Sequence, residues 1–172
     1  MQPINLSWAA LTVKNNMKAL IRYGLILLVL AGISGCRSRA LFDDNKSFPD
    51  HVWKSGQIVR FDVPLNDIHS SCKFYLNIRH STSYRYSNLF LFINTTFPDG
   101  NEARDTVECI LAEPSGKWVG KGISDIRDNQ VLLRRGIRFQ QQGTYIFEIE
   151  QAMRDPELEG IMDVGLRIEK EN

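Results

Sequence analysis

Apolar and polar residues alternate with a period close to two along most of the chain after residue 58. Successive side chains of a strand point to opposite faces, so this alternation predicts strands with one buried face and one polar face. The expected strands cover residues 59–63, 72–79, 88–97, 104–112, 131–139, 145–150 and 164–168, with 117–122 as an additional short strand. No helical stripe of any length follows Cys36.

Turn residues separate these segments. Pro64 ends the first strand, and Pro98-Asp99-Gly100-Asn101 lies between two strands that we expect to form a hairpin. Gly136 interrupts the segment 131–139 and indicates a bulge. Seven to eight short strands at regular spacing predict an all-β fold, an antiparallel β-sandwich or jelly roll.

The N-terminal region has the pattern of a secretory signal. A short basic stretch with Lys18 and Arg22 precedes an apolar run from Tyr23 to Leu30. This run is shorter than the roughly 20 apolar residues that span a bilayer, so we expect it to be removed. The stretch that follows, Ile33-Ser34-Gly35-Cys36, resembles a bacterial lipobox, in which the cysteine is lipidated and becomes the new N-terminus.

The lipobox divides the chain into three parts. Residues 1–35 are the expected signal peptide, and 1–16 are attributed to a start codon assigned too early, because Met17-Lys18 is a more ordinary start. Residues 36–52 contain the lipidated cysteine and a polar tether. Residues 53–172 form a single β-sandwich domain, with Trp53 as the first core residue.

The charge of the mature chain excludes some partners. After Cys36 there are 18 basic and 20 acidic residues, a net charge of −2. A nucleic-acid-binding domain usually has a basic face, and binding to anionic lipid heads usually needs a polybasic cluster. We therefore expect no nucleic-acid partner, and membrane attachment through lipidated Cys36.

Two cysteines remain for pairing after lipidation. Cys72 and Cys109 are in phase with apolar residues of their strands, so both side chains are expected to face the interior. An exported chain meets an oxidising compartment, so the two are a candidate disulfide pair. The alternative is two buried free thiols, since cysteine often serves as a small apolar core residue.

No pattern in the chain indicates catalysis. His51, His69 and His80 do not have metal-ligand spacing, and neither a glycine-rich phosphate loop nor a nucleophile elbow is present. We therefore expect a protein that is not an enzyme and that holds neither a metal nor a cofactor.

Two polar loops are the expected interaction surface, because loops on a rigid scaffold are where binding usually occurs. The loop 81–87 carries Tyr84 and Tyr86, and the segment 151–160 carries Met153 and Arg154. Tyr, Met and Arg are enriched at interfaces. The alternative is that Met153 packs inward and Arg154 forms a local ion pair. Exposed Tyr84, Tyr86 and Trp118 would instead suit a carbohydrate-binding lipoprotein.

Further motifs carry a resemblance to a known family. They are Ile78-Arg79, Tyr86-Ser87-Asn88-Leu89, Phe97-Pro98-Asp99-Gly100, Asp105-Thr106, the run from Gly116 to Gly122, and the C-terminal run from Gly143 to Arg167. With Cys36, Trp53 and Tyr84, they make the chain similar to the gliding-motility lipoprotein GldH family of the Bacteroidetes.

The resemblance implies a non-enzymatic, structural or assembly component of the cell envelope, associated with gliding and type IX secretion. Its expected partners are envelope proteins of that machinery. The expected location is the periplasmic side of the outer membrane, with the inner membrane as the alternative. Relatives occur in non-motile members of the phylum, so the resemblance does not imply that the host cell glides. The one functional residue that transfers is the lipidated cysteine, onto Cys36.

Overall fold

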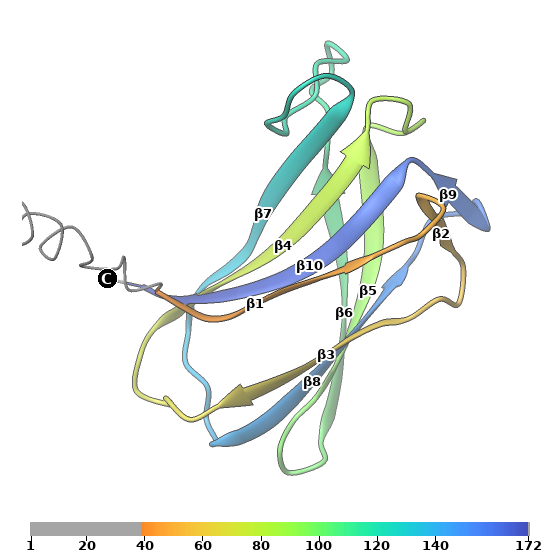
Figure 1. The fold of residues 1–172 in the computed structure, drawn as a ribbon. Coiled ribbons are helices and arrows are strands. Elements are labelled where there is room, and N and C mark those ends of the chain that lie inside the picture. The colour runs from red at the N-terminus through yellow and green to blue at the C-terminus, as the bar shows by residue number, and fades with distance from the viewer. Residues whose placement is uncertain (1–38, 172) are drawn as a thin grey trace, which may run out of the picture. The chain divides into compact units, whose positions relative to one another are not determined.

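The computed structural model describes residues 39–171 as two four-stranded antiparallel sheets packed in a sandwich, with a two-stranded sheet at one end (Figure 1). The front sheet contains, in spatial order, β1 (Ala40–Ser47), β10 (Ile161–Lys170), β4 (Cys72–Ser81) and β7 (Ile126–Ile137). The back sheet contains β3 (Val59–Leu65), β8 (Gly143–Gln151), β5 (Asn88–Thr96) and β6 (Glu102–Ile110). The small sheet pairs β2 (Val52–Lys54) with β9 (Glu157–Glu159). The predicted all-β antiparallel sandwich is confirmed.

The apolar residues of the period-two pattern form the core of the sandwich. On β3, Val59, Phe61 and Val63 are buried while the residues between them are exposed. On β4, alternate residues from Cys72 to His80 are buried. The buried faces of the two sheets meet, and Phe74 of the front sheet lies 5.1 Å, centroid to centroid, from Phe147 of the back sheet. Among the described residues there is no apolar helix of membrane-spanning length.

The predicted polar tether over residues 36–52 is wrong from residue 40 onward. Residues 40–47 form β1, which pairs along its length with β10. The strand resembles a linker in sequence because residues 43–47 are all polar. Asp43 on the outward face pairs with Arg167 of β10, and Lys46 pairs with Asp44. The inward side chains of β1 are core contacts, since Phe42 packs edge-on against Phe61. Cys36 and the predicted signal peptide lie outside the described residues.

Several strand boundaries also differ from those predicted. Pro64 lies within β3, which is an edge strand and tolerates a residue without an N–H donor. Strand β7 begins at Ile126, and residues 117–122 contribute only the isolated bridges of Trp118 with Ala112 and of Lys121 with Asp128. The predicted bulge at Gly136 is confirmed, because the β4–β7 register shifts there and Gly136 has a φ of 69°.

Cys72 and Cys109 are free thiols at opposite ends of the sandwich. Cys72 begins β4, whereas Cys109 lies near the end of β6, close to the Tyr84 side chain that follows β4. The candidate disulfide is therefore not formed, because a disulfide needs Cα atoms within about 7 Å. Both side chains are buried, as their strand phase predicts. Burial raises the pKa of the Cys109 thiol to about 12.

Candidate functional site

The structure brings together the two loops that were predicted to bind partners. The hydroxyl of Tyr86 donates a hydrogen bond to the carboxylate of Asp155, and so links the loop 81–87 to the segment 151–160. The Sδ atom of Met153 accepts a hydrogen bond from the N–H of Phe90 at 3.3 Å. Tyr86 and Met153 are half-buried and pack against the core, so Met153 follows the inward alternative. Arg154 is exposed and forms no ion pair with any described residue.

The assignment of Tyr84 to an interaction surface is wrong. Its side chain is 4% exposed, and its hydroxyl donates to the carbonyl of Asn88 at 3.1 Å. The loop folds over the end of the sandwich because Gly160 allows close approach: a Cβ there would lie 3.2 Å from the Tyr84 nitrogen. Trp118 is also half-buried and packs against His80 at 4.6 Å.

These aromatic side chains do not form the open platform that a sugar would need. The pocket beside Tyr84 and Tyr86 has a volume of about 90 Å³. Pockets for small ligands usually have about 300–1,000 Å³. The carbohydrate-binding alternative therefore loses the surface on which it was based.

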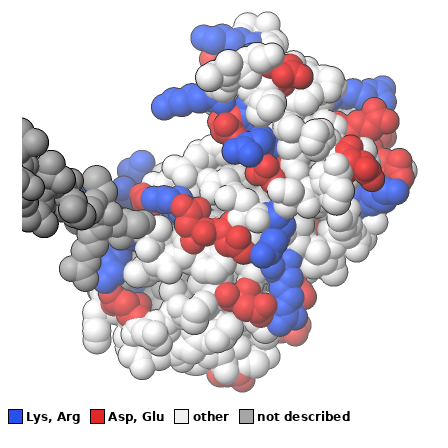
Figure 2. Space-filling model, viewed as in Figure 1, with Lys and Arg blue, Asp and Glu red and all other residues white. Residues whose placement is uncertain are grey.

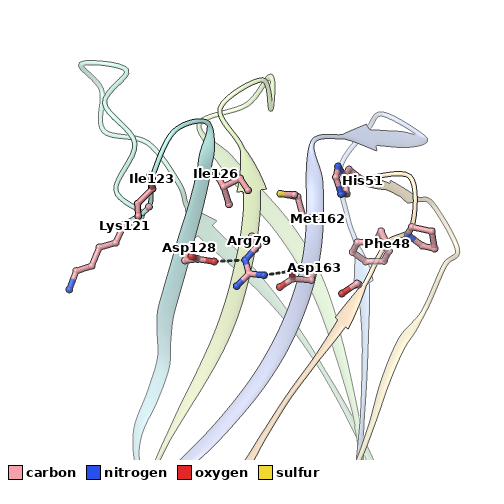
Figure 3. A pocket seen from close by; sticks show the side chains of 12 residues that line it. Phe48, His51, Arg79, Lys121, Ile123, Ile126, Asp128, Met162 and Asp163 are labelled. Carbon is pink, nitrogen blue, oxygen red and sulfur yellow. Dashed lines mark hydrogen bonds and ion pairs between the residues drawn. The ribbon is translucent and has the colours of Figure 1, made fainter.

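A larger pocket of about 720 Å³ lies at one end of the front sheet (Figure 3). We call it the end pocket. Its lining comes from the end of β1 and the segment after it, the end of β4, the start of β10, and the start of β7 with the loop before it: Ser47, Phe48, Pro49, His51, Arg79, Lys121, Gly122, Ile123, Ile126, Asp128, Met162 and Asp163. It lies at the opposite end of β1 from Arg39.

A charged trio forms the polar part of the end pocket. Arg79, Asp128 and Asp163 are direct cross-strand neighbours on β4, β7 and β10. The Nε atom of Arg79 donates to Asp128 at 2.6 Å, and its Nη1 atom lies 3.4 Å from Asp163 (Figure 3). Burial raises the pKa of the Asp163 carboxyl, and the charge of Arg79 opposes that shift. One guanidinium thus partly neutralises two carboxylates.

The rim of the end pocket is apolar and partly unprotected. Ile123 is 90% exposed, which is unusual for an isoleucine, while Ile126 and Met162 are half-buried. The loop that presents Ile123 requires a glycine, since a Cβ on Gly122 would lie 2.0 Å from the Ile126 carbonyl oxygen. The end pocket therefore combines an apolar rim with a charged trio.

Sequence reasoning missed the end pocket. The three charged residues are far apart in the chain and meet only through the register of three strands. One local signal was available: Ile123 is an isolated apolar residue within the otherwise small and polar stretch 120–125. Within residues 39–171, no three His, Cys, Asp or Glu side chains are arranged to hold a metal ion.

His80 is a buried titratable residue that packs behind this end of the front sheet. Its side chain is 0% exposed and lies against Trp118 and Tyr84. Its Nδ1 atom donates to the carbonyl of Ser81 at 2.9 Å, which leaves Nε2 without a partner among the described residues. Burial lowers the pKa of this imidazole below its ordinary value of 6.5.

We expect the free energy of unfolding to fall as the pH drops from about 7.5 to about 6, by at most about 1.4 kcal/mol per pH unit for this one group. The unfolded chain takes up a proton on His80 in this range, whereas the folded chain resists it. Urea unfolding at several pH values measures the slope. His80→Phe should flatten the slope, and exposed His69→Gln should not; equal slopes in all three proteins would contradict the assignment.

Charges on the visible face are mixed. Lys and Arg side chains alternate with Asp and Glu side chains, and neither sign gathers into a patch on this face (Figure 2). The described residues include local and cross-strand ion pairs, such as Arg60 with Asp62 and Arg167 with Asp43. This face therefore has no basic patch that would bind a polyanion.

Comparisons with known proteins agree on one family. The family model described as GldH lipoprotein matches residues 40–168. A gliding motility lipoprotein GldH homolog of Christiangramia forsetii is 33% identical over 161 residues, 90% of this chain and 98% of the relative. The gliding motility lipoprotein GldH of Flavobacterium johnsoniae is 32% identical over 156 residues, 87% of this chain and 96% of the relative.

One solved structure has a weak similarity to this chain. A chain from the structure of infectious bursal disease virus Gx strain aligns with 75% of this chain and 32% of its own length, at 10% identity and a TM-score of 0.31. This similarity carries no argument about fold or function.

Proposed function

This chain belongs to the GldH lipoprotein family, and we propose that it is a non-enzymatic lipoprotein that holds a protein-binding surface at a membrane. The family confirms the resemblance inferred from the sequence, and it gives the chain a membrane-anchored location in the cell envelope. Lipid on Cys36 is the proposed anchor, and the periplasmic side of the outer membrane is the proposed location. Envelope proteins of the gliding and secretion machinery are the proposed partners.

The observation that carries this proposal is the end pocket with its exposed Ile123. Cys36 lies three residues before Arg39, so a lipid there would tether the domain by the end at which β1 begins. The end pocket follows the other end of this eight-residue strand, about 26 Å away at the usual rise per residue. The start of β1 and the end pocket therefore lie at different ends of the front sheet.

The chemistry of the pocket favours a protein partner. Ile123, Ile126 and Met162 supply apolar area that a partner would bury. Arg79 is held by two carboxylates and keeps a half-exposed side chain. Interface centres commonly combine arginine and methionine with apolar residues in this way. An enzymatic function at the end pocket has less support, because Asp128 and Asp163 are already paired with Arg79.

We expect Ile123→Asp to reduce partner capture at the end pocket at least about tenfold, because loss of a buried anchor typically costs 2 kcal/mol or more of binding. A photo-crosslinking residue placed at Lys121 in the full-length lipoprotein, in native membranes, measures the yield of each crosslinked envelope protein.

Ile58→Asp is the matched control, since Ile58 is also an exposed isoleucine but lies outside the pocket. Both variants should unfold within about 1 kcal/mol of the parent, as surface changes do. Equal crosslinking of the same proteins by both variants would exclude the end pocket as the partner-binding surface. Strong glycan binding by the purified protein would favour the carbohydrate alternative instead.

A further inference from the structure

The outer strand β6 presents an unpaired backbone edge. It is the last strand of the back sheet, and it pairs only with β5. The hydrogen-bonding phase is fixed at both ends, because Phe97 N–H donates to the Asn101 carbonyl and Leu111 N–H donates to the Ser87 carbonyl, each at 2.8 Å. Hydrogen-bonded pairs alternate in an antiparallel ladder. The N–H and C=O groups of residues 102, 104, 106, 108 and 110 therefore point away from β5.

The other three outer strands of the two described four-stranded sheets are each interrupted. The register of β1 shifts near Ala40, β3 contains Pro64, and β7 has two register shifts against β4. Such bulges and prolines normally protect sheet edges from pairing with another chain. Strand β6 has nine successive pairs with β5, no shift and no proline. It is the regular, unprotected edge within residues 39–171.

The side chains of β6 leave this edge uncovered. The guanidinium of Arg104 lies 4.2 Å from the ring centroid of Phe92, and Glu108 accepts a hydrogen bond from Asn88 at 2.6 Å. Both partners belong to β5, so these long side chains lean inward over the sheet. They do not fold outward over the free backbone groups.

A cleft of about 550 Å³, lined by apolar and polar side chains, opens beside the same edge, between β6 and β7. Its apolar lining comes from both sheets and includes Phe97, Leu133, Ile137, Phe139, Tyr145 and Phe147. Ala103, Asp105 and Val107, the inward residues of β6, line its β6 side. The sandwich is therefore incompletely filled along this side.

We propose that the edge and the cleft together bind one extended strand of a partner protein, with apolar side chains at alternate positions. Its backbone would pair with β6, and every second side chain would enter the cleft. The free N–H and C=O groups of β6 favour a polypeptide over an acyl chain, because only a polypeptide can form backbone hydrogen bonds with them. The apolar side chains of the cleft favour a strand with apolar residues at alternate positions. The inference rests on the proposed function, since it names a class of partner for a protein-binding lipoprotein, but it uses a surface separate from the end pocket.

The test uses the full lipidated protein in detergent micelles and a labelled nonapeptide of alternating valine and threonine, with solubilising lysines at its ends. The control peptide has the same composition with its valines consecutive. Fluorescence anisotropy should show that the alternating peptide binds at least about tenfold more tightly. Equal affinity of the two peptides would overturn the proposal.

Three variants locate the binding. Thr106→Pro removes an outward N–H without touching the β5 ladder and should weaken binding at least about tenfold, whereas Thr106→Val keeps the N–H and should bind normally. Ala103→Trp should block the cleft with a similar loss. Unchanged peptide binding by Thr106→Pro and Ala103→Trp would overturn the proposal. Self-association of the protein that Thr106→Pro abolishes would also overturn it, and so would binding of a fatty acid without binding of the peptide. The Ile123→Asp variant should still bind the alternating peptide. Loss of partner binding at the end pocket can therefore be distinguished from loss of peptide binding at β6.

Discussion

Trp53→Ala is expected to lower the free energy of unfolding by about 3–5 kcal/mol, the usual cost of truncating a buried aromatic residue. Trp53 is 0% exposed and stacks on Phe48 with ring centroids 5.1 Å apart. Its Nε1–H donates to the carbonyl of Gln57 at 2.8 Å. The truncation would leave a cavity between the small sheet and the sandwich and an unsatisfied carbonyl beside it.

Urea denaturation of the purified protein measures this effect. Lys54→Ala is the matched control, because Lys54 is the exposed neighbour on the same short strand. The control should change the free energy of unfolding by less than about 0.5 kcal/mol. A loss below about 1 kcal/mol for Trp53→Ala would mean that the small sheet does not contribute to the cooperative core.

Cys36→Ala is expected to remove the membrane anchor. The mature domain has a net charge near zero, so attachment depends on the acyl chains, and more than one chain on a residue gives stable anchoring. Without them the protein should leave the membrane fraction or accumulate as its precursor. Fractionation followed by mass spectrometry of the mature N-terminus measures both outcomes, and the parent protein should show an acylated Cys36.

Ser38→Ala is the control, since Ser38 follows the lipobox and is not part of it. It should remain in the membrane fraction. Two results would contradict the lipobox assignment: a parent protein with an unmodified N-terminus, or a Cys36→Ala variant that stays fully membrane-bound after processing.

Several strands could be predicted from sequence because their signal is local. On β3 and β8 the alternation of apolar and polar residues is uninterrupted, and the structure confirms both strands close to their predicted bounds. The hairpin of β5 and β6 also follows from local turn chemistry around Gly100, which has a φ of 86°. These features need no knowledge of distant parts of the chain.

The candidate sites could not be predicted in the same way. Tyr84 lies in a segment with the polar composition of a surface loop, yet Gly160 lets this loop fold inward, and the Tyr84 side chain is buried. Arg79 gives no sign in the sequence that Asp128 and Asp163 flank it, because strand register decides that. The bare edge of β6 likewise depends on sheet order, which alternation does not encode.

The sequence by itself determined the all-β class, the strands of strong alternation and the family resemblance, because each depends on residues that are close together in the chain. The lipidation of Cys36 stays a prediction from the sequence. The tertiary structure decided that residues 40–47 are a strand rather than a tether, since the polar run 43–47 is recognisable as part of a strand only once β10 pairs with it. It also decided that the end pocket and the β6 edge exist. Both arise from pairing between segments far apart in the chain, where a one-residue change in register would present different side chains.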